Sequence, residues 1–318
     1  MNPQIQTLAT GIAAGLATAA LAAALSNGAA LLFVFAPLPV MLASLGWGVS
    51  AGTIAAMVAV GAVTVAVSPN SGMLVALVIV LPATLAAQVA NLARPAEEVG
   101  GPVGKLVWFP LADIVLWTAI ALGIGFILSG ILIGFGPEFS AGLAAAMKEA
   151  MALSGQEATI TPEQVEAVAR MMTTVLPALM PGTWVALMLA NFYIALSILA
   201  RAGMAKRPRD DWPTALRLPR PGLYVFGAAL AAAFLPGGLG HAASALAGAL
   251  GAAFIMAGFA TLHARTRGAD WRAPALGLAY VATAFFSPVL FIFLIAGLFD
   301  TRRQAVLSDA GAPTNPNS

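Results

Sequence analysis

Residues 108–134 read WFPLADIVLWTAIALGIGFILSGILIG, an apolar run with one charged side chain, Asp113. A helix that crosses a bilayer needs roughly 20 mostly apolar residues, and this run is longer than that. The whole chain has the same character, because 60% of its 318 residues are hydrophobic and 9% are charged. Soluble domains have about 25% charged residues. The composition therefore predicts a protein embedded in lipid, and it excludes a soluble enzyme, a disordered chain and a nucleic-acid-binding protein.

Comparable apolar runs predict an all-α, polytopic membrane helix bundle with about eight to nine transmembrane helices. We expect these spans near 7–26, 29–46, 48–67, 72–92, 108–134, 176–200, 222–238, 241–263 and 274–299. No Lys or Arg precedes the first run, so we expect it to stay in the protein and not to be a cleaved signal peptide. Turn signals such as Pro236-Gly237-Gly238 separate several spans and favour antiparallel neighbours.

The expected spans divide the chain into four parts. Residues 1–200 form a six-helix membrane core with an external helical insert at 135–175. A basic loop occupies 201–221, further transmembrane helices occupy 222–300, and a polar tail at 301–318 reads as disordered.

The basic residues predict the orientation of the bundle. Loops rich in Lys and Arg remain in the cytoplasm, and here the basic residues cluster in three connections: Arg94 and Lys105; Arg201, Lys206, Arg207, Arg209, Arg217 and Arg220; and Arg265, Arg267 and Arg272. Four spans precede the first of these connections. We therefore expect a multi-pass protein of the bacterial inner membrane with a cytoplasmic N-terminus and an external 135–175 segment.

The last apolar run leaves two alternatives open. A ninth full span at 274–299 would place Arg302 and Arg303 outside, against the positive-inside rule. Either the run breaks at Ser287-Pro288 and returns to the cytoplasm as a short hairpin, or an earlier pair of spans is miscounted. We favour a cytoplasmic C-terminus.

The external insert has a helix start of its own. Thr161 is a suitable N-cap, Pro162 suits the first helical position, and Gln164 completes a capping box. Apolar residues then recur at three-to-four spacing as far as Leu179, which predicts an amphipathic helix leading into the sixth span. Such a helix packs on its own bundle, lies in the membrane interface, or gates an external cavity.

Two polar residues within apolar runs are candidates for ligand binding. Asp113 follows Pro110 by three residues, so it belongs to a first helical turn, where the helix dipole favours a carboxylate. Asn191 lies near the middle of its span. An amide at that depth either faces a cavity or bonds to a neighbouring helix, and the helix contact is the commoner role.

Small residues line the first span at four-residue spacing. Ala9, Ala13 and Ala17 form one stripe, and Gly11, Gly15, Ala19 and Ala23 form another. Small residues let helix backbones approach closely in lipid. The stripes predict either packing within the bundle, which is the commoner case, or docking of a partner helix.

The 201–220 loop predicts contact with lipid headgroups or with a partner. Lys206, Arg207 and Arg209 stand at its centre, and juxtamembrane basic residues attract anionic headgroups by roughly 1 kcal/mol each.

Motifs of catalysis are missing from the sequence. It contains no cysteine, no phosphate-binding loop ending in Gly-Lys-Ser or Gly-Lys-Thr, no His-Glu-x-x-His and no Gly-x-Ser-x-Gly. We therefore expect no enzyme activity, no metal site and no cofactor.

Several short motifs occur in an order that resembles the YybS-like family of predicted bacterial membrane proteins, a domain-of-unknown-function family. They are Pro37-Leu-Pro39-Val-Met, Gly46-Trp-Gly48-Val-Ser-Ala-Gly52, Trp212-Pro213-Thr-Ala-Leu-Arg217-Leu-Pro219, Ala257-Gly258-Phe-Ala-Thr-Leu-His263, Phe286-Ser287-Pro288 and Gly297-Leu-Phe-Asp300-Thr-Arg302-Arg303. The resemblance covers about residues 5–305.

That family is distantly similar to the substrate-binding membrane subunits of energy-coupling-factor transporters. The similarity implies a six-helix core at 7–200 and docking of a coupling subunit, with its ATPases, on Ala9, Ala13 and Ala17. The long external insert and the extra spans depart from that pattern.

Two functions remain open. The first is a substrate-binding transport subunit that takes a small molecule into a cavity open to the outside near spans four to six and needs a separate energising partner. The second is a membrane scaffold or regulatory protein that acts through partner helices and the 201–220 loop. An intramembrane enzyme acting on lipid is the least favoured class, because catalytic side chains are scarce.

Overall fold

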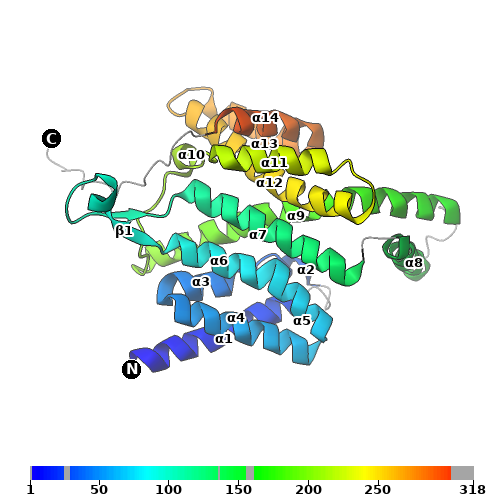
Figure 1. Ribbon diagram of the computed structural model, residues 1–318, viewed down its shortest axis with the longest axis horizontal. Helices are drawn as coiled ribbons and strands as arrows, with labels where there is room; N and C mark the ends of the chain where they lie inside the picture. Colours follow the sequence, from blue (N-terminus) through cyan, green and yellow to red (C-terminus); the bar gives the residue numbers. More distant parts are fainter. Residues whose placement is uncertain (1, 25–28, 135–136, 155–160, 302–318) are drawn as a thin grey trace.

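The computed structural model describes residues 2–24, 29–134, 137–154 and 161–301, and these residues are almost entirely helical (Figure 1). In chain order the elements are α1 (Pro3–Ala23), α2 (Ala30–Phe33), α3 (Leu38–Trp47), α4 (Val49–Ala66), α5 (Pro69–Val75), the π-helical η1 (Ala76–Val80), α6 (Leu81–Ala90), β1 (Ala93–Pro95), η2 (Ala96–Val99), β2 (Leu106–Trp108), α7 (Leu111–Ile133), α8 (Pro137–Ser154), α9 (Pro162–Arg201), α10 (Trp212–Ala215), α11 (Arg220–Ala232), α12 (Gly237–Arg265), α13 (Arg272–Phe285), η3 (Ser287–Val289) and α14 (Leu290–Phe299).

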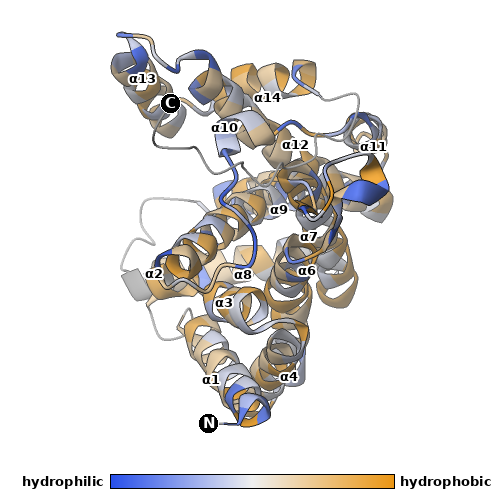
Figure 2. Cartoon of the chain, turned by 90° about the vertical axis from the view of Figure 1, so that its left-hand side faces the viewer, coloured by the Kyte–Doolittle hydropathy of each residue, from blue (hydrophilic) through white to orange (hydrophobic). Residues whose placement is uncertain are grey.

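The expected all-α membrane bundle is confirmed. Among the described residues, six helices are long and apolar enough to cross a membrane: α1, α4, the continuous α5–η1–α6, α7, α9 and α12. Viewed from the end that carries β1, hydrophilic colour gathers in the connecting loops, whereas the helices are largely hydrophobic (Figure 2).

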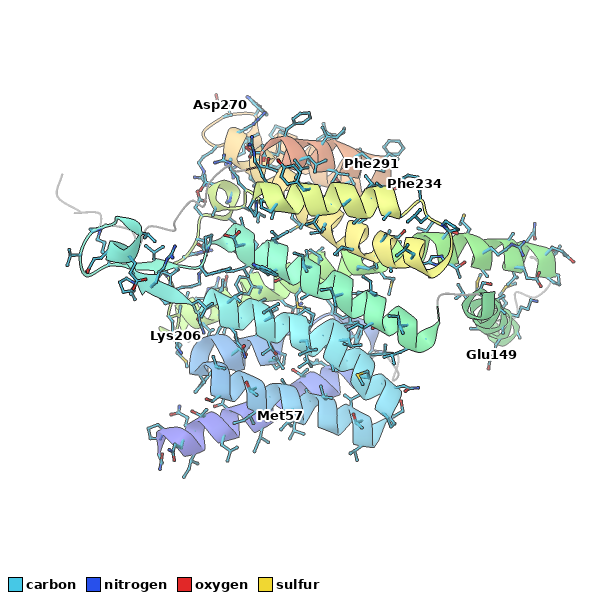
Figure 3. All side chains as sticks on the ribbon, viewed as in Figure 1. Met57, Glu149, Lys206, Phe234, Asp270 and Phe291 are labelled. Carbon is cyan, nitrogen blue, oxygen red and sulfur yellow. The ribbon has the colours of Figure 1, made fainter. Side chains whose placement is uncertain are left out.

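The three basic connections meet at one end of the bundle. Arg207 in the 202–219 loop donates to the carbonyl oxygens of Ala90 and Phe109, which flank the β1–β2 hairpin. Asp211 in the same loop binds Arg267, which follows α12. Lys206 lies at this end and Glu149 of α8 at the opposite one (Figure 3). We call these the loop end and the α8 end.

Two of the expected spans are shorter or broken. The 29–46 run divides into α2 and α3 around a turn at 34–37, because Pro37 and Pro39 favour a new helix start and cannot continue the previous one. The 222–238 run forms α11, whose 13 residues extend about 20 Å, less than a bilayer core. Pro236 and Gly237 then begin α12, as the turn signal predicts.

The 274–299 run breaks at Ser287-Pro288 into α13 and α14, as the first of the two alternatives expects. Gly258 of α12 packs against Gly297 of α14, and three residues further along each helix Thr261 bonds to Asp300. Because the paired positions advance in the same direction, α14 runs parallel to α12 and ends at the loop end. Residues 302–318, including Arg302 and Arg303 and most of the expected disordered tail, lie outside the described residues.

A single buried core joins both halves of the chain. The main cluster includes side chains of α3, α6, α7 and α9 together with Phe226 of α11 and Leu250 and Phe254 of α12. Helix α12 packs on both α7 and α9. Residues 1–200 and 222–300 therefore share one hydrophobic core.

The insert expected at 135–175 contains α8 and the first part of α9, which pack together. The Thr161 side chain accepts from the Gln164 backbone N–H, and the Gln164 side chain accepts from the Thr161 N–H, so the expected capping box is confirmed. Helix α9 has 40 residues and extends about 60 Å, so its first part reaches beyond the other helices. Helix α8 packs against that part through Ala144, Val165 and Ala169.

Candidate functional site

A cavity of about 400 Å³ opens between the helices near the α8 end. Small-molecule sites typically enclose about 300–1,000 Å³. The lining residues come from the α2 end, α5–η1, α7, α9 and the start of α12: Phe33, Leu74, Val75, Val78, Ile79, Phe126, Ser129, Gly130, Ile133, Gly134, Thr173, Leu176, Pro177, Met180, Trp184, His241 and Ala245. Most of them belong to the fourth, fifth and sixth spans expected from the sequence.

The end of the cavity nearer the bundle centre is apolar. Trp184 and Phe33 meet there in an edge-to-face contact with ring centroids 5.4 Å apart. Phe126 of α7 and Val78 of η1 also line the cavity. No Asp, Glu, Lys or Arg lines the cavity in the described part of the chain.

Three polar side chains, Ser129, Thr173 and His241, also line the cavity. The Ser129 hydroxyl donates to the Gly125 carbonyl at 2.8 Å, and the Thr173 hydroxyl donates to the Arg170 carbonyl at 2.8 Å. Both hydroxyl hydrogens are therefore used within their own helices, and the oxygens keep lone pairs that can accept. His241, in the first turns of α12, is the one titratable side chain among the lining residues.

Prolines alter the backbone of two helices around the cavity. Pro82 has no N–H for the Val78 carbonyl, and just before it the chain forms η1, in which Leu81 N–H bonds to Ala76. In α9, Pro177 and Pro181 likewise leave the carbonyls of Thr173 and Pro177 without their usual helical donors. Val78, Thr173 and Pro177 all line the cavity.

Asn191 and Asp113 lie outside this cavity. The Asn191 side chain is 1% exposed, and its amide donates to Val34 at 2.9 Å and to Leu187 at 2.8 Å. Val34 belongs to the turn that interrupts the second apolar run, so Asn191 joins α9 to that turn. Asp113 occupies the first turn of α7 at the loop end, as expected from its distance to Pro110. The structure does not bring the two candidate ligand-binding residues into one site.

The two small-residue stripes of α1 have different surroundings. Gly11, Gly15 and Ala19 are buried, and side chains at the two glycines would collide with α4, at Ile54 and at the Ala55 carbonyl. Ala9, Ala13 and Ala17 are exposed on the outer face of α1. The expectation of internal packing therefore holds for the glycine stripe and is wrong for the alanine stripe.

The expectation that Arg207 contacts lipid headgroups or a partner is wrong. Arg207 is 4% exposed, and besides Ala90 and Phe109 it pairs with the Asp210 carboxylate at 2.7 Å. It satisfies the last carbonyl of α6, which has no partner within the helix. Arg207 therefore fastens the loop to the bundle.

Other side chains of the loop make similar attachments. Trp212 packs on Phe192 and Tyr193 of α9, and Asp300 accepts from Arg217 at 3.1 Å and from Thr261 at 2.8 Å. Hydrogen bonds from Arg267 hold the pKa of the Asp211 carboxyl below its ordinary value.

Lys206 and Arg209 are exposed, which leaves them available to headgroups. The Lys206 ammonium lies close to Gly48 at the α3–α4 turn, and Arg209 donates to the Tyr193 hydroxyl at 3.1 Å.

The sequence predicts which spans surround the cavity, but it does not identify most of the residues that line it. Trp184, Phe33 and Ala245 read as ordinary core residues, because apolar side chains at helical spacing occur in every span. The useful signal was the group Pro82, Pro177 and Pro181, whose positions predict altered backbone near a cavity.

A family model described as "Predicted membrane protein (DUF2232)" matches residues 5–301. No curated protein and no solved structure matches the chain. The match covers nearly all of the residues that form the bundle, the cavity and the attached loop. The chain therefore belongs to this family of membrane proteins of unknown function.

Proposed function

We propose that this protein is a substrate-binding membrane subunit that holds a small ligand in the cavity between α5–η1, α7, α9 and α12. The observation that supports the proposal is the cavity itself, which has a volume of about 400 Å³ and is bounded by α5–η1, α7, α9 and the start of α12. Its uncharged lining and altered backbone are typical of ligand sites within membranes.

A separate energising partner is part of the proposal. The sequence contains no phosphate-binding loop, so binding has to be coupled to transport by another subunit with ATPases. The exposed stripe of Ala9, Ala13 and Ala17 suits the close approach of a partner helix. A scaffold acting through the 202–219 loop is less well supported, because Arg207 and Arg217 of that loop are engaged within the chain.

We further propose that the loop end faces the cytoplasm of a bacterial inner membrane and that the α8 end faces outside. The basic connections meet at the loop end, where cytoplasmic loops are expected to be basic. Helix α1 also begins at this end (Figure 1), which makes the N-terminus cytoplasmic.

Cysteine labelling tests the orientation, because the chain has no cysteine of its own. Single cysteines in place of Pro208 and Asp270 should react only after the membrane is made permeable, whereas one in place of Glu149 should react in intact cells. Reaction of all three from the same side would overturn the proposed orientation.

Occlusion of the cavity tests the function. Leu176→Trp places an indole ring where Leu176 lines the cavity, and Leu179→Trp adds the same ring one turn away on the exposed face of α9. Native mass spectrometry of protein extracted with its lipids should show a bound species that the wild type and Leu179→Trp retain and Leu176→Trp loses. Equal retention by both variants would place binding elsewhere and contradict the proposal.

Co-purification with ATPases would support transport, and an assembly without them would support the scaffold.

A further inference from the structure

The chemistry of the lining limits what the cavity can hold. Burial of an ionised group in an apolar site costs far more than burial of a neutral polar group, unless an opposite charge accompanies it. No Lys or Arg lines the cavity within the described residues, and His241 is the one titratable side chain there, so the lining offers no permanent cation to a carboxylate or phosphate. The lining therefore favours an uncharged occupant.

Ser129 and Thr173 offer hydrogen-bond acceptors to an occupant, and the His241 imidazole is the other polar side chain of the lining. Ser129 and Thr173 have donated their hydroxyl hydrogens to Gly125 and Arg170, which leaves only oxygen lone pairs. The carbonyls of Thr173 and Pro177 add further acceptors, because the prolines that follow them cannot donate. A ligand group that satisfies these atoms must carry a hydrogen-bond donor, such as a hydroxyl or an N–H.

Thr173 and Trp184 lie at different depths of the cavity. Helix α9 rises about 1.5 Å per residue, so Thr173 lies roughly 16 Å along the axis from Trp184, and both line the cavity. Trp184 and Phe33 meet at the deep end, whereas Thr173 belongs to the α8 end. Apolar side chains such as Leu176 and Ile133 also line the cavity, so Thr173 marks the accepting end of a largely apolar space and Trp184 marks its deep end.

We infer that the ligand is an uncharged amphiphile with a hydroxyl or N–H donor toward the α8 end and a hydrocarbon body that reaches Trp184. This inference rests on the proposed function, since it concerns the occupant of the same cavity. It separates a neutral lipid-like alcohol or amide from a fatty-acid anion and from the phosphate of a phospholipid.

Bromine quenching of Trp184 fluorescence tests the inference with the full-length protein in nanodiscs. The probes are 11-bromoundecan-1-ol, its methyl ether and 11-bromoundecanoic acid at pH 8, where the acid is ionised. The specific signal is the quenching of the wild type minus that of Trp184→Phe, which removes the contribution of the lipid-facing tryptophans. The alcohol should bind roughly two- to tenfold more tightly than the ether, which has lost the donor. The acid should bind more than about tenfold more weakly than the alcohol.

Two further comparisons give the orientation of the bound probe and its location in the protein. 2-Bromoundecan-1-ol, with bromine beside the hydroxyl, should quench Trp184 less than the 11-bromo isomer. Leu176→Trp should abolish the specific signal and Leu179→Trp should keep it.

The outcomes separate this inference from the proposed function. Three outcomes would each overturn the inferred ligand class: equal binding of the alcohol and the ether, tighter binding of the acid than of the alcohol, or stronger quenching by the 2-bromo isomer than by the 11-bromo isomer. The proposed function would survive any of these outcomes if Leu176→Trp still abolished the specific signal. The absence of any Trp184-specific quenching by all the probes would overturn both proposals.

Discussion

Gly258 of α12 and Gly297 of α14 face each other where the two helices cross. A methyl group on Gly258 would overlap the Phe293 carbonyl, and one on Gly297 would overlap the Phe254 carbonyl. Each glycine thus admits the backbone of the other helix, as small residues do at close helix crossings in membranes. This contact holds the returning half of the last apolar run against the longest helix of the C-terminal half.

Gly258→Ala should therefore lower stability, even though alanine is the better helix former. The overlap with a backbone carbonyl forces the helices apart, at a cost of about 1–3 kcal/mol. Gly277→Ala in α13 is the matched control, because a side chain there meets open space and should gain up to about 1 kcal/mol of helix propensity. Thermal unfolding of the purified variants makes the comparison. Equal melting temperatures would mean that the crossing is looser than described.

Arg207→Ala should destabilise the protein far more than Arg209→Ala. Arg207→Ala removes the guanidinium that pairs with the Asp210 carboxylate, which is 3% exposed, and breaking a buried pair in this way costs about 3–5 kcal/mol. Arg209 is exposed and bonds only to the Tyr193 hydroxyl, so its loss should change stability by about 0.5 kcal/mol or less. Chemical unfolding in detergent measures both changes. Similar losses for the two variants would contradict the assignment of Arg207 as the loop's attachment.

Substitutions in the two stripes of α1 should have opposite effects. Ala13→Leu adds bulk on an exposed face, so thermal stability should hold, whereas co-purification of a membrane partner should fail if the stripe is its docking face. Gly15→Leu forces a side chain into Ala55 and Val58 of α4 and should unfold the helix pair. Melting temperatures and pull-downs from membranes provide the two measurements. Intact partner binding by a stable Ala13→Leu protein would remove the stripe from the proposed interface.

Asn191→Leu should lower stability and leave ligand retention unchanged. The substitution keeps a similar volume and removes the bonds to Val34 and Leu187, and amide bonds between membrane helices contribute about 0.6–2 kcal/mol. The loss should lie within this range in unfolding experiments, while native mass spectrometry shows the same bound species as the wild type. Loss of that species from a fully stable variant would instead indicate a ligand contact.

The sequence predicts features of this protein that depend on local chemistry. The start of α9 is set by Thr161, Pro162 and Gln164, which are adjacent in the chain, and the capping box forms as expected. The start of α12 after Pro236 likewise follows from residues close in sequence.

Features set by packing between distant segments could not be predicted. The alanine and glycine stripes of α1 look alike in the sequence, and only the position of α4 decides which is buried. Arg207 resembles its basic neighbours, but its partners at Ala90 and Phe109 are about a hundred positions away in the chain. The cavity has no motif, because it is the space left between helices that come from distant parts of the chain.

The attachment made by Arg207 has a consequence for biosynthesis. Its partner Ala90 precedes it by 117 residues, so α6 and α7 leave the translocon well before Arg207 is synthesised. The first half of the chain is then inserted in the bilayer before the segment between α6 and α7 can bind Arg207. This contact forms only when the 202–219 loop emerges. A nascent chain arrested before Arg207 would accordingly be an insertion intermediate in which the connection between α6 and α7 still lacks its attachment to the loop.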